Sequence, residues 1–198
     1  MIRIAVVGDI GSGKSFVARQ FGYPVFDADL EVRKLYKKSR KCYYKIKKIL
    51  PDYISSFPIK KTELTKAILK NKKNLKKINK IIHPEIRLKM KKFLRKNKNF
   101  FFVVLDIPLL IENKINKKGD ILVYVSANRK LISKKLKKRP NFNSKILKKL
   151  RKSQFSVDKK ISKCDFIIRN NFKHDTTRKH VKRVLQKIKL NARSNTRY

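Results

Sequence analysis

The chain has 198 residues, of which 41% are hydrophobic, so it is long enough to fold around a sizeable core as one domain. The two cysteines, Cys42 and Cys164, lie far apart without the spacing of metal ligands, which favours reduced thiols over a zinc site or a disulfide. The longest apolar segments, around 100–105 and 107–111, are far too short for a membrane span. The first apolar run begins at residue 2 and leaves no room for an export signal. We therefore expect a cytoplasmic protein without a membrane partner.

The charge of the chain is its most unusual compositional feature. There are 56 Lys and Arg against 13 Asp and Glu, which gives a formal net charge of +43 at pH 7. Such an excess is typical of proteins that bind nucleic acid. Here, however, the lysines are spread over nearly every predicted helix, and no zinc-finger or aromatic RNA-binding signature accompanies them. We expect salt-dependent adhesion to polyanions but no specific nucleic-acid partner, and a monomer or weak homo-oligomer.

A phosphate-binding motif lies directly after the first apolar run. Residues Gly8 to Ser15 read G-D-I-G-S-G-K-S, which matches G-x-x-x-x-G-K-[ST], and residues 16–21 continue with helical character. In such a loop the backbone N–H groups of residues 10–15 point at phosphate oxygens, the lysine reaches the terminal phosphates, and the serine hydroxyl holds Mg²⁺. The motif predicts that these backbone groups and Lys14 bind ATP, and that Ser15 is a metal ligand. The six residues concerned are Ile10, Gly11, Ser12, Gly13, Lys14 and Ser15.

The remaining chain alternates between strands and helices. Short apolar runs typical of buried parallel strands occur at 2–7, 24–26, 101–105, 121–125 and 166–168. Helical patterns separate these runs, which together with the loop predicts an α/β fold: a P-loop NTPase-like, doubly wound parallel five-stranded sheet.

A long insertion separates the second strand from the third. Residues 33–98 contain no good strand pattern, whereas Ile86, Met90, Phe93 and Leu94 recur at the spacing of one helix face. Pro84 suits the first turn of that helix, so we expect a helix to open at 84 and at least one more helix upstream. The insertion is predicted to be an all-helical subdomain.

Two further segments complete the predicted organisation. Residues 129–156 have the form of two helices and a turn, broken at Pro140 and restarted near Asn143, and we interpret them as a lid. An amphipathic helix follows the last strand, and residues 191–198 are predicted to be a disordered tail. The predicted single domain thus has a core of 1–32, 99–128 and 157–190, the subdomain 33–98, the lid 129–156 and the tail.

Carboxylates follow two of the predicted strands, at the edge of the sheet where α/β proteins bind ligands. Asp27 and Asp29 come after the second strand, and Asp106 comes after the third. A carboxylate in such a place can hold a metal or accept the proton of an attacking hydroxyl. Asp27 is equally suited to cap the next helix, so the choice between Asp27 and Asp29 as the base stays open.

Several motifs occur in an order that resembles one family. After the phosphate loop come V-F-D-A-D from Val25 with Arg33 four residues on, the pair His83 and Pro84, D-I-P-L-L-I-E from Asp106, and C-D-F-I-I-R-N from Cys164. Together they resemble dephospho-coenzyme A kinases, which perform the last step of coenzyme A synthesis, and the likeness covers nearly the whole chain. The run D-x-P-L-L-x-E discriminates best, because many unrelated kinases share the phosphate loop.

The resemblance implies a role for each matched residue. Asp29 is implied as the catalytic base for the ribose 3′-hydroxyl of dephospho-coenzyme A, and Lys14 as a catalytic residue that bridges to the transferred group. Asp106 is implied to support Mg²⁺, and Arg139 to close a lid over ATP and balance the charge of the moving phosphoryl group. Arg33, His83, Pro108 and Leu109 are implied on the acceptor side. Two of these residues also have a structural interpretation without ligand contact. His83 could simply be a helix-start residue, and Arg139 could be part of a solvated basic face that includes Lys137 and Lys138.

The chain departs from the family pattern at four positions. Val7 stands where the family usually has threonine, Asp9 where it has glycine, Lys61 where arginine is common, and Leu150 where the lid often carries arginine. Asp9 would repel a polyphosphate if its side chain faced inward, so we expect it to point outward. A different small-molecule or nucleotide P-loop kinase is the alternative function, and a nucleic-acid-binding protein that uses ATP as a switch is the third.

Overall fold

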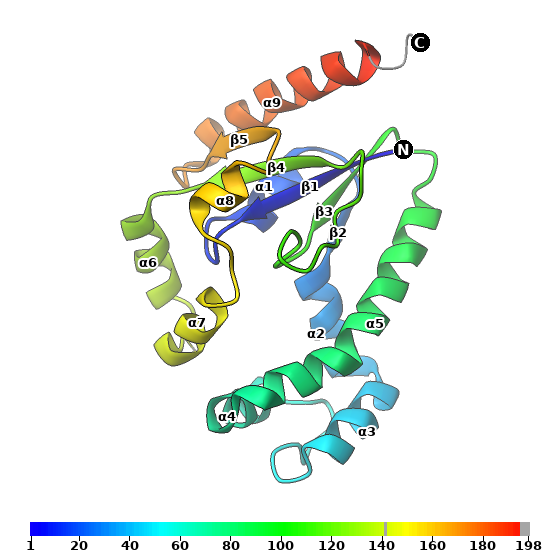
Figure 1. The fold of residues 1–198 in the computed structure, drawn as a ribbon, viewed down its shortest axis with the longest axis vertical. Coiled ribbons are helices and arrows are strands. Elements are labelled where there is room, and N and C mark those ends of the chain that lie inside the picture. The colour runs from blue at the N-terminus through cyan, green and yellow to red at the C-terminus, as the bar shows by residue number, and fades with distance from the viewer. Residues whose placement is uncertain (141, 195–198) are drawn as a thin grey trace. The chain divides into compact units, whose positions relative to one another are not determined.

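The computed structural model describes residues 1–140 and 142–194. Its centre is a five-stranded sheet with the strand order β2-β3-β1-β4-β5. Strands β3 and β4 flank β1, and β5 pairs with β4, all in parallel. The strands are β1 (Ile2–Gly8), β2 (Val25–Asp27), β3 (Phe102–Asp106), β4 (Ile121–Ser126) and β5 (Phe166–Arg169). The five predicted strands and the α/β class are therefore confirmed (Figure 1).

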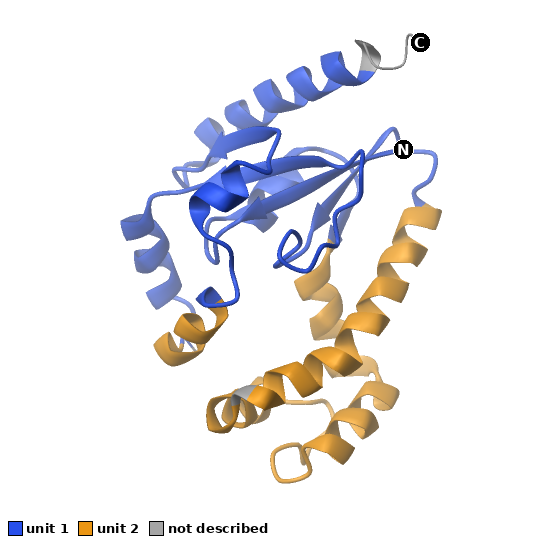
Figure 2. Ribbon diagram, viewed as in Figure 1, with its two compact units in different colours: residues 1–26, 97–142, 151–198 blue, residues 27–96, 143–150 orange. Residues whose placement is uncertain are grey.

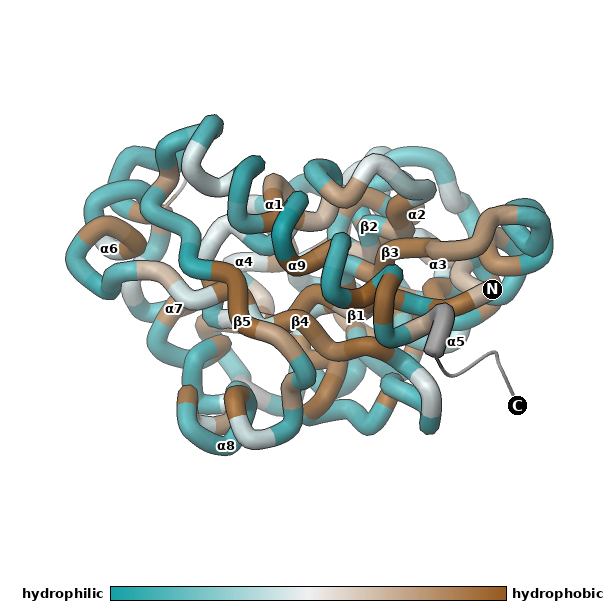
Figure 3. Tube along the Cα trace, turned by 90° about the horizontal axis from the view of Figure 1, so that it is seen from above, coloured by the Kyte–Doolittle hydropathy of each residue, from teal (hydrophilic) through white to brown (hydrophobic). Residues whose placement is uncertain are grey.

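The strand sequences are nearly continuous apolar runs because both faces of the central strands are buried. Ile4 and Val6 of β1 lie in the core cluster of one face, with Val104 and Val123 from its neighbours. Ala5, the residue between them, is equally buried. Figure 3 shows this pattern as brown, hydrophobic residues along β1, β3 and β4 and mostly teal residues along the helices.

The chain divides into two compact units, which are coloured separately in Figure 2. Unit 1 comprises residues 1–26, 97–142 and 151–198, and unit 2 comprises 27–96 and 143–150. The helices of unit 1 are α1 (Lys14–Gln20), α6 (Arg129–Lys137), α8 (Val157–Ile161) and α9 (His174–Ser194). The helices of unit 2 are α2 (Ala28–Lys38), α3 (Arg40–Ile49), α4 (Lys61–Lys70), α5 (Lys72–Lys96) and most of α7 (Ser144–Arg151).

Each unit has its own hydrophobic core. In unit 1, Val17 of α1, the following Phe21, and Val181 and Ile188 of α9 pack on the sheet. In unit 2, a second cluster of buried residues is built from helices and the loop between α3 and α4, with Ile46 of α3 and Ala67 of α4 fully buried in it. The insertion predicted over 33–98 is helical throughout its described elements, as expected, although α2 already begins at Ala28.

Two predicted boundaries are wrong. No helix opens at Pro84, because α5 is one helix from Lys72 to Lys96 with Pro84 inside it. Proline lacks an N–H and clashes with the preceding turn, which normally ends or kinks a helix, but the apolar face of α5 extends upstream through Ile78 and Ile82, both buried. Packing of that face outweighs the local cost of proline.

The predicted tail is the second correction. Helix α9 continues through Ser194, so residues 191–194 are helical, and the buried Ala192 belongs to the core of unit 1. Burial of Ala192 explains the extension, since the polar composition alone predicted none. The rest of the predicted tail, 195–198, lies outside the described residues.

Candidate active site

The predicted phosphate loop connects β1 to α1 at the carboxyl end of the central strand. Gly8 ends β1, and Gly11 and Gly13 have φ values of 87° and 89°, which side-chain-bearing residues rarely adopt. A Cβ on Gly13 would lie 2.2 Å from Nδ2 of Asn170, and one on Gly11 would lie 2.9 Å from Cγ of Leu136. Both glycines are therefore required by backbone conformation and by close packing, and the loop has the form that the motif predicts.

The Lys14 ammonium lies over the loop. Its Nζ donates to the carbonyl oxygens of Gly8 and Asp9, at 3.1 and 2.9 Å. A flexible lysine side chain on the first residue of α1 can leave these neutral acceptors for a phosphate, which offers a full charge. The geometry thus suits the predicted role of Lys14.

The loop is fastened to the turn that follows β5. Asn170, which is 3% exposed, donates from Nδ2 to the Ser12 carbonyl at 2.8 Å. Its Oδ1 accepts from the Phe172 backbone N–H and the Thr177 hydroxyl, both at 2.9 Å. Ser12 is 1% exposed, and its buried hydroxyl has no hydrogen-bond partner among the described residues. A buried donor of this kind, inside a loop shaped for anions, fits a site completed by a ligand oxygen.

Asp106 lies beside this loop in the sheet. It ends β3, is 5% exposed, and is in register with Val6 of β1, two residues before Gly8. Parallel neighbours place Asp106 and the start of the loop at the same edge of the sheet, as predicted.

Ser15 and Asp106 offer the oxygen ligands that Mg²⁺ prefers. The described residues contain no group of three or more His, Cys, Asp and Glu that would hold a metal without other help. That sparse donor set fits Mg²⁺, which is usually bound by one or two protein oxygens together with substrate phosphates.

The D-I-P-L-L-I-E segment forms the turn after β3. Pro108 is exposed and Leu109 adopts a left-handed φ of 55°, whereas Leu110 and Ile111 are buried. Pro108 thus lies on the surface with Leu109 next to it, and burial of the next two residues holds the turn in place.

The lid segment is divided between the units. Its first helix, α6, packs Ile132 and Leu136 against Gly11 of the phosphate loop, and Asn128 caps it as a helix N-terminus. Arg139 follows α6 and is exposed. This position is compatible both with a lid arginine and with a solvated basic face. Asn143 accepts from the Ile146 N–H at the start of α7, as predicted for the restart after Pro140.

Asp27, Asp29 and Arg33 lie in unit 2. The Asp27 carboxylate accepts from the Leu30 N–H at 2.8 Å and caps α2, so its capping role is confirmed. Asp29 is the second residue of α2 and is exposed, and Arg33 lies four residues later on the same face.

His83 lies inside α5, so it is not a helix-start residue. Its side chain is exposed, yet partial desolvation and the neighbouring Arg87 lower its pKa. Both effects disfavour the imidazolium, and the imidazole is neutral near pH 7.

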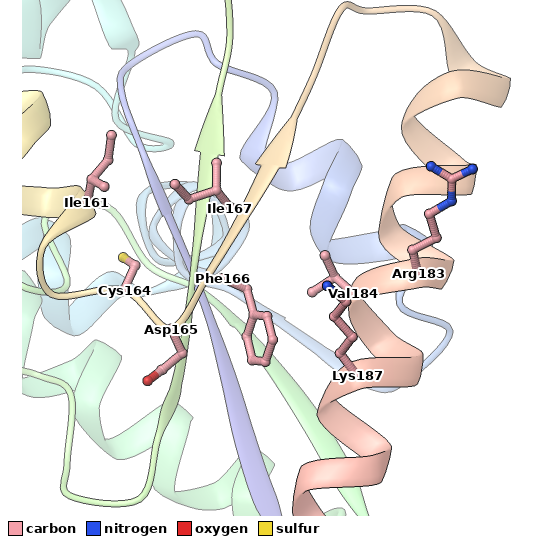
Figure 4. A pocket seen from close by; sticks show the side chains of 8 residues that line it. All are labelled: Ile161, Cys164, Asp165, Phe166, Ile167, Arg183, Val184 and Lys187. Carbon is pink, nitrogen blue, oxygen red and sulfur yellow. The ribbon is translucent and has the colours of Figure 1, made fainter.

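A separate hollow of about 450 Å³ lies at the other end of the edge strand β5, lined by Cys164, Phe166 and Val184 among others (Figure 4). Phe166 is the first residue of β5, and ligands of open α/β sheets bind where strands end, so this hollow is not part of the candidate site. Burial and, to a smaller extent, Asp165 raise the pKa of the Cys164 thiol to about 12, which leaves it unreactive.

Comparison with known proteins agrees with this geometry. The family model for dephospho-CoA kinase matches residues 2–176. The chain belongs to the dephospho-CoA kinase family. A dephospho-CoA kinase of Wolbachia pipientis wMel is 32% identical over 193 residues, covering 95% of this chain and 98% of that protein. One from Bartonella henselae is 34% identical with the same coverage.

Two solved structures share the fold of this chain. The chain matches TT1252 from Thermus thermophilus with a TM-score of 0.75, covering 94% of this chain and 97% of that one. It matches a dephospho-CoA kinase from Campylobacter jejuni with a TM-score of 0.62, covering 94% and 96%. Each is 22% identical, so these matches bear on the fold alone. The predicted family and the enzyme class, a kinase with ATP as co-substrate, are confirmed by the family match.

Two residues of the site escaped the sequence analysis. Asn170 stands in the C-D-F-I-I-R-N run that carried part of the resemblance, but nothing in the sequence indicates that it holds the phosphate loop. Lys160, whose ammonium pairs with Asp9, is one lysine in a lysine-rich segment. The one signal in the sequence is the acidic Asp9 inside the glycine-rich phosphate loop, because a carboxylate at that place needs a cation to balance it.

Proposed function

We propose that this kinase transfers the γ-phosphoryl group of ATP to the ribose 3′-hydroxyl of dephospho-coenzyme A, giving coenzyme A and ADP. The observation that carries the proposal is the phosphate loop with Asp106 beside it, in a chain that also has the D-x-P-L-L-x-E run of its family. Phosphoryl transfer requires that the reactants are positioned and that their charge is stabilised. The phosphate loop and the segment that begins at Asp106 supply groups for both.

In this proposal the phosphate loop binds ATP through the backbone N–H groups of residues 10–15 and the Lys14 ammonium. Ser15 and Asp106 would hold Mg²⁺, which supplies charge neutralisation on the β- and γ-phosphates when bound. Arg139 contacts the transferred phosphoryl group and balances its charge, and closure of its segment excludes water as a competing nucleophile.

Asp29 is the proposed general base. The ribose 3′-oxygen forms the new bond to the γ-phosphorus, its proton passes to the Asp29 carboxylate, and the bond between the γ-phosphorus and the bridging oxygen of ADP breaks. Arg33, His83, Pro108 and Leu109 bind the acceptor. A neutral His83 would contribute hydrogen bonding or packing, since its lowered pKa removes its charge at pH 7.

The experiment that tests the proposal is an acceptor panel. Purified protein with Mg-ATP is given dephospho-coenzyme A, AMP, other nucleotides or water, and ADP formation is measured. We expect rapid ADP formation with dephospho-coenzyme A alone, and a phosphate at the 3′ position of the product by ³¹P NMR. Equal turnover across the panel would overturn the acceptor assignment and leave a kinase of different specificity.

Location and partners remain part of the proposal. No helix among the described residues is long and apolar enough to cross a membrane. We propose a cytoplasmic monomer or weak homo-oligomer whose lysine-rich surface attracts polyanions without sequence preference. Retention on immobilised DNA or RNA at high salt would contradict the last point, because attraction of that kind fades steeply as salt rises.

A further inference from the structure

A buried lysine lies beneath the first residues of the phosphate loop. Lys160 of α8 has a side chain that is only 1% exposed, although lysine is among the residues least often buried. Its Nζ is 2.8 Å from Oδ1 of Asp9 and 3.8 Å from Oε1 of Glu112. Lys160 therefore connects the phosphate loop, the D-I-P-L-L-I-E segment and α8, all within unit 1.

The three charges depend on one another. A buried ammonium is costly unless carboxylates pair with it, and Asp9 and Glu112 provide two. Glu112 is 7% exposed and also accepts the Phe155 backbone N–H at 3.0 Å. Without Lys160, two carboxylates would face each other in a poorly hydrated place.

Asp9 is the member of this group that bears on ATP. It is the second residue of the loop, between Gly8 and Ile10, where a carboxylate raises the negative potential that a triphosphate must meet. The Asp9 side chain is 30% exposed, so water screens it only in part. Its pairing with Lys160 cancels this charge at the place where it would oppose nucleotide binding.

We propose that Lys160 is a positioning residue for ATP, which neutralises Asp9 and holds the first turn of the phosphate loop in its binding shape. This inference rests on the proposed function, in which the bound ATP is the phosphoryl donor. Lys160 acts through Asp9 and does not contact the substrate.

The test compares nucleotide affinity in matched variants. We expect Lys160→Met to raise the Kd of Mg-ATP, measured by titration calorimetry without acceptor, by at least about tenfold. We expect KM for ATP to rise by a similar factor and kcat to change much less. Lys163→Met removes an exposed lysine from the same segment and is expected to leave both constants at the wild-type values.

Charge removal distinguishes neutralisation from a purely structural role. Asp9→Asn in the Lys160→Met background removes the carboxylate that Lys160 would have paired, so we expect the Kd of Mg-ATP to return to within about threefold of wild type. Lys160→Arg keeps the cation and is expected to bind ATP nearly as well as wild type. Wild-type affinity in Lys160→Met, or no recovery in the double variant, would overturn the proposal.

A third variant keeps the proposal testable if Lys160→Met fails to fold. Asp9→Asn alone leaves Lys160 with Glu112, and we expect ATP affinity equal to or tighter than that of wild type. A tenfold loss in this variant would show that the Asp9 carboxylate itself supports nucleotide binding, against the proposal. Because these titrations contain no acceptor, they remain decisive even if the acceptor panel fails, so the two failures are distinguishable.

Discussion

The polar residues of the two units are held in very different ways. Around the phosphate loop of unit 1, Ser12, Lys160 and Asn170 are each 3% exposed or less, and the last two make defined bonds to the loop. In unit 2, the proposed acceptor residues Asp29, Arg33 and His83 are exposed on helices. Unit 1 thus fixes its site by burial, whereas unit 2 presents side chains on surfaces.

The strongest polar network of unit 2 serves its own folding. The Glu63 carboxylate near the start of α4 accepts hydrogen bonds from Ser55, Ser56 and the Lys60 N–H, at 2.8 to 3.2 Å. These bonds hold the loop between α3 and α4. The difference teaches that the proposed nucleotide site is preorganised in the fold of unit 1, as electrostatic sites for phosphoryl transfer require, whereas the polar network of unit 2 stabilises a loop.

The largest expected effect tests whether an exposed residue of unit 2 is nevertheless essential for chemistry. Asp29→Asn removes the proposed base, and general-base catalysis contributes about 10²- to 10⁴-fold, so we expect kcat to fall by that factor. The Kd of Mg-ATP, measured by titration calorimetry, is expected to stay at the wild-type value because the phosphate loop is unchanged.

The matched control for this variant is Asp27→Asn. Asparagine caps a helix about as well as aspartate, so the bond to the Leu30 N–H is kept and activity is expected near wild type. If Asp27→Asn lost activity and Asp29→Asn did not, the base would be Asp27 and the assignment of the two carboxylates would be reversed.

A smaller effect is expected where unit 1 fastens its loop. Asn170→Ala leaves the buried Ser12 carbonyl and Thr177 hydroxyl without their partner, at about 1–3 kcal/mol for each unsatisfied group. We expect a lower melting temperature and a raised KM for ATP. Asn171→Ala, at the adjacent exposed position, is the control and is expected to change both much less. An unchanged KM for ATP in Asn170→Ala would mean that the loop keeps its shape without this anchor.

The same contrast explains how much the sequence reveals. The five strands and the phosphate loop could be predicted because apolar runs and left-handed glycines are local requirements of the backbone. The full length of α5 and of α9 could not, because burial of Ile82 and Ala192 overrides the local signals of Pro84 and of a polar tail. Lys160 and Asn170 were missed since their partners Asp9 and Ser12 are more than 150 residues away in the chain. The acceptor residues were assigned by resemblance, and their roles stay predictions.

The smallest effect concerns the acid stability of unit 2. Burial favours the neutral form of Glu63, but the hydrogen bonds from Ser55, Lys60 and Ser56 outweigh it and lower the pKa to about 2, from 4.5. A lowered pKa in the folded state adds stability that is fully present above pH 4.5 and is lost as the pH falls toward 2. We expect Glu63→Gln to lower the free energy of unfolding, measured in urea at pH 6, by about 1–2 kcal/mol. Between pH 5 and pH 3, this variant is expected to lose less further stability than wild type does.

The control is Glu85→Gln, which removes an ion pair to the exposed Lys41. Its free energy of unfolding is expected to stay within about 0.5 kcal/mol of wild type at pH 6. Parallel pH profiles for wild type and Glu63→Gln, with no loss of stability at pH 6, would show that this network does not stabilise unit 2, and the contrast between the units would then rest on unit 1 alone.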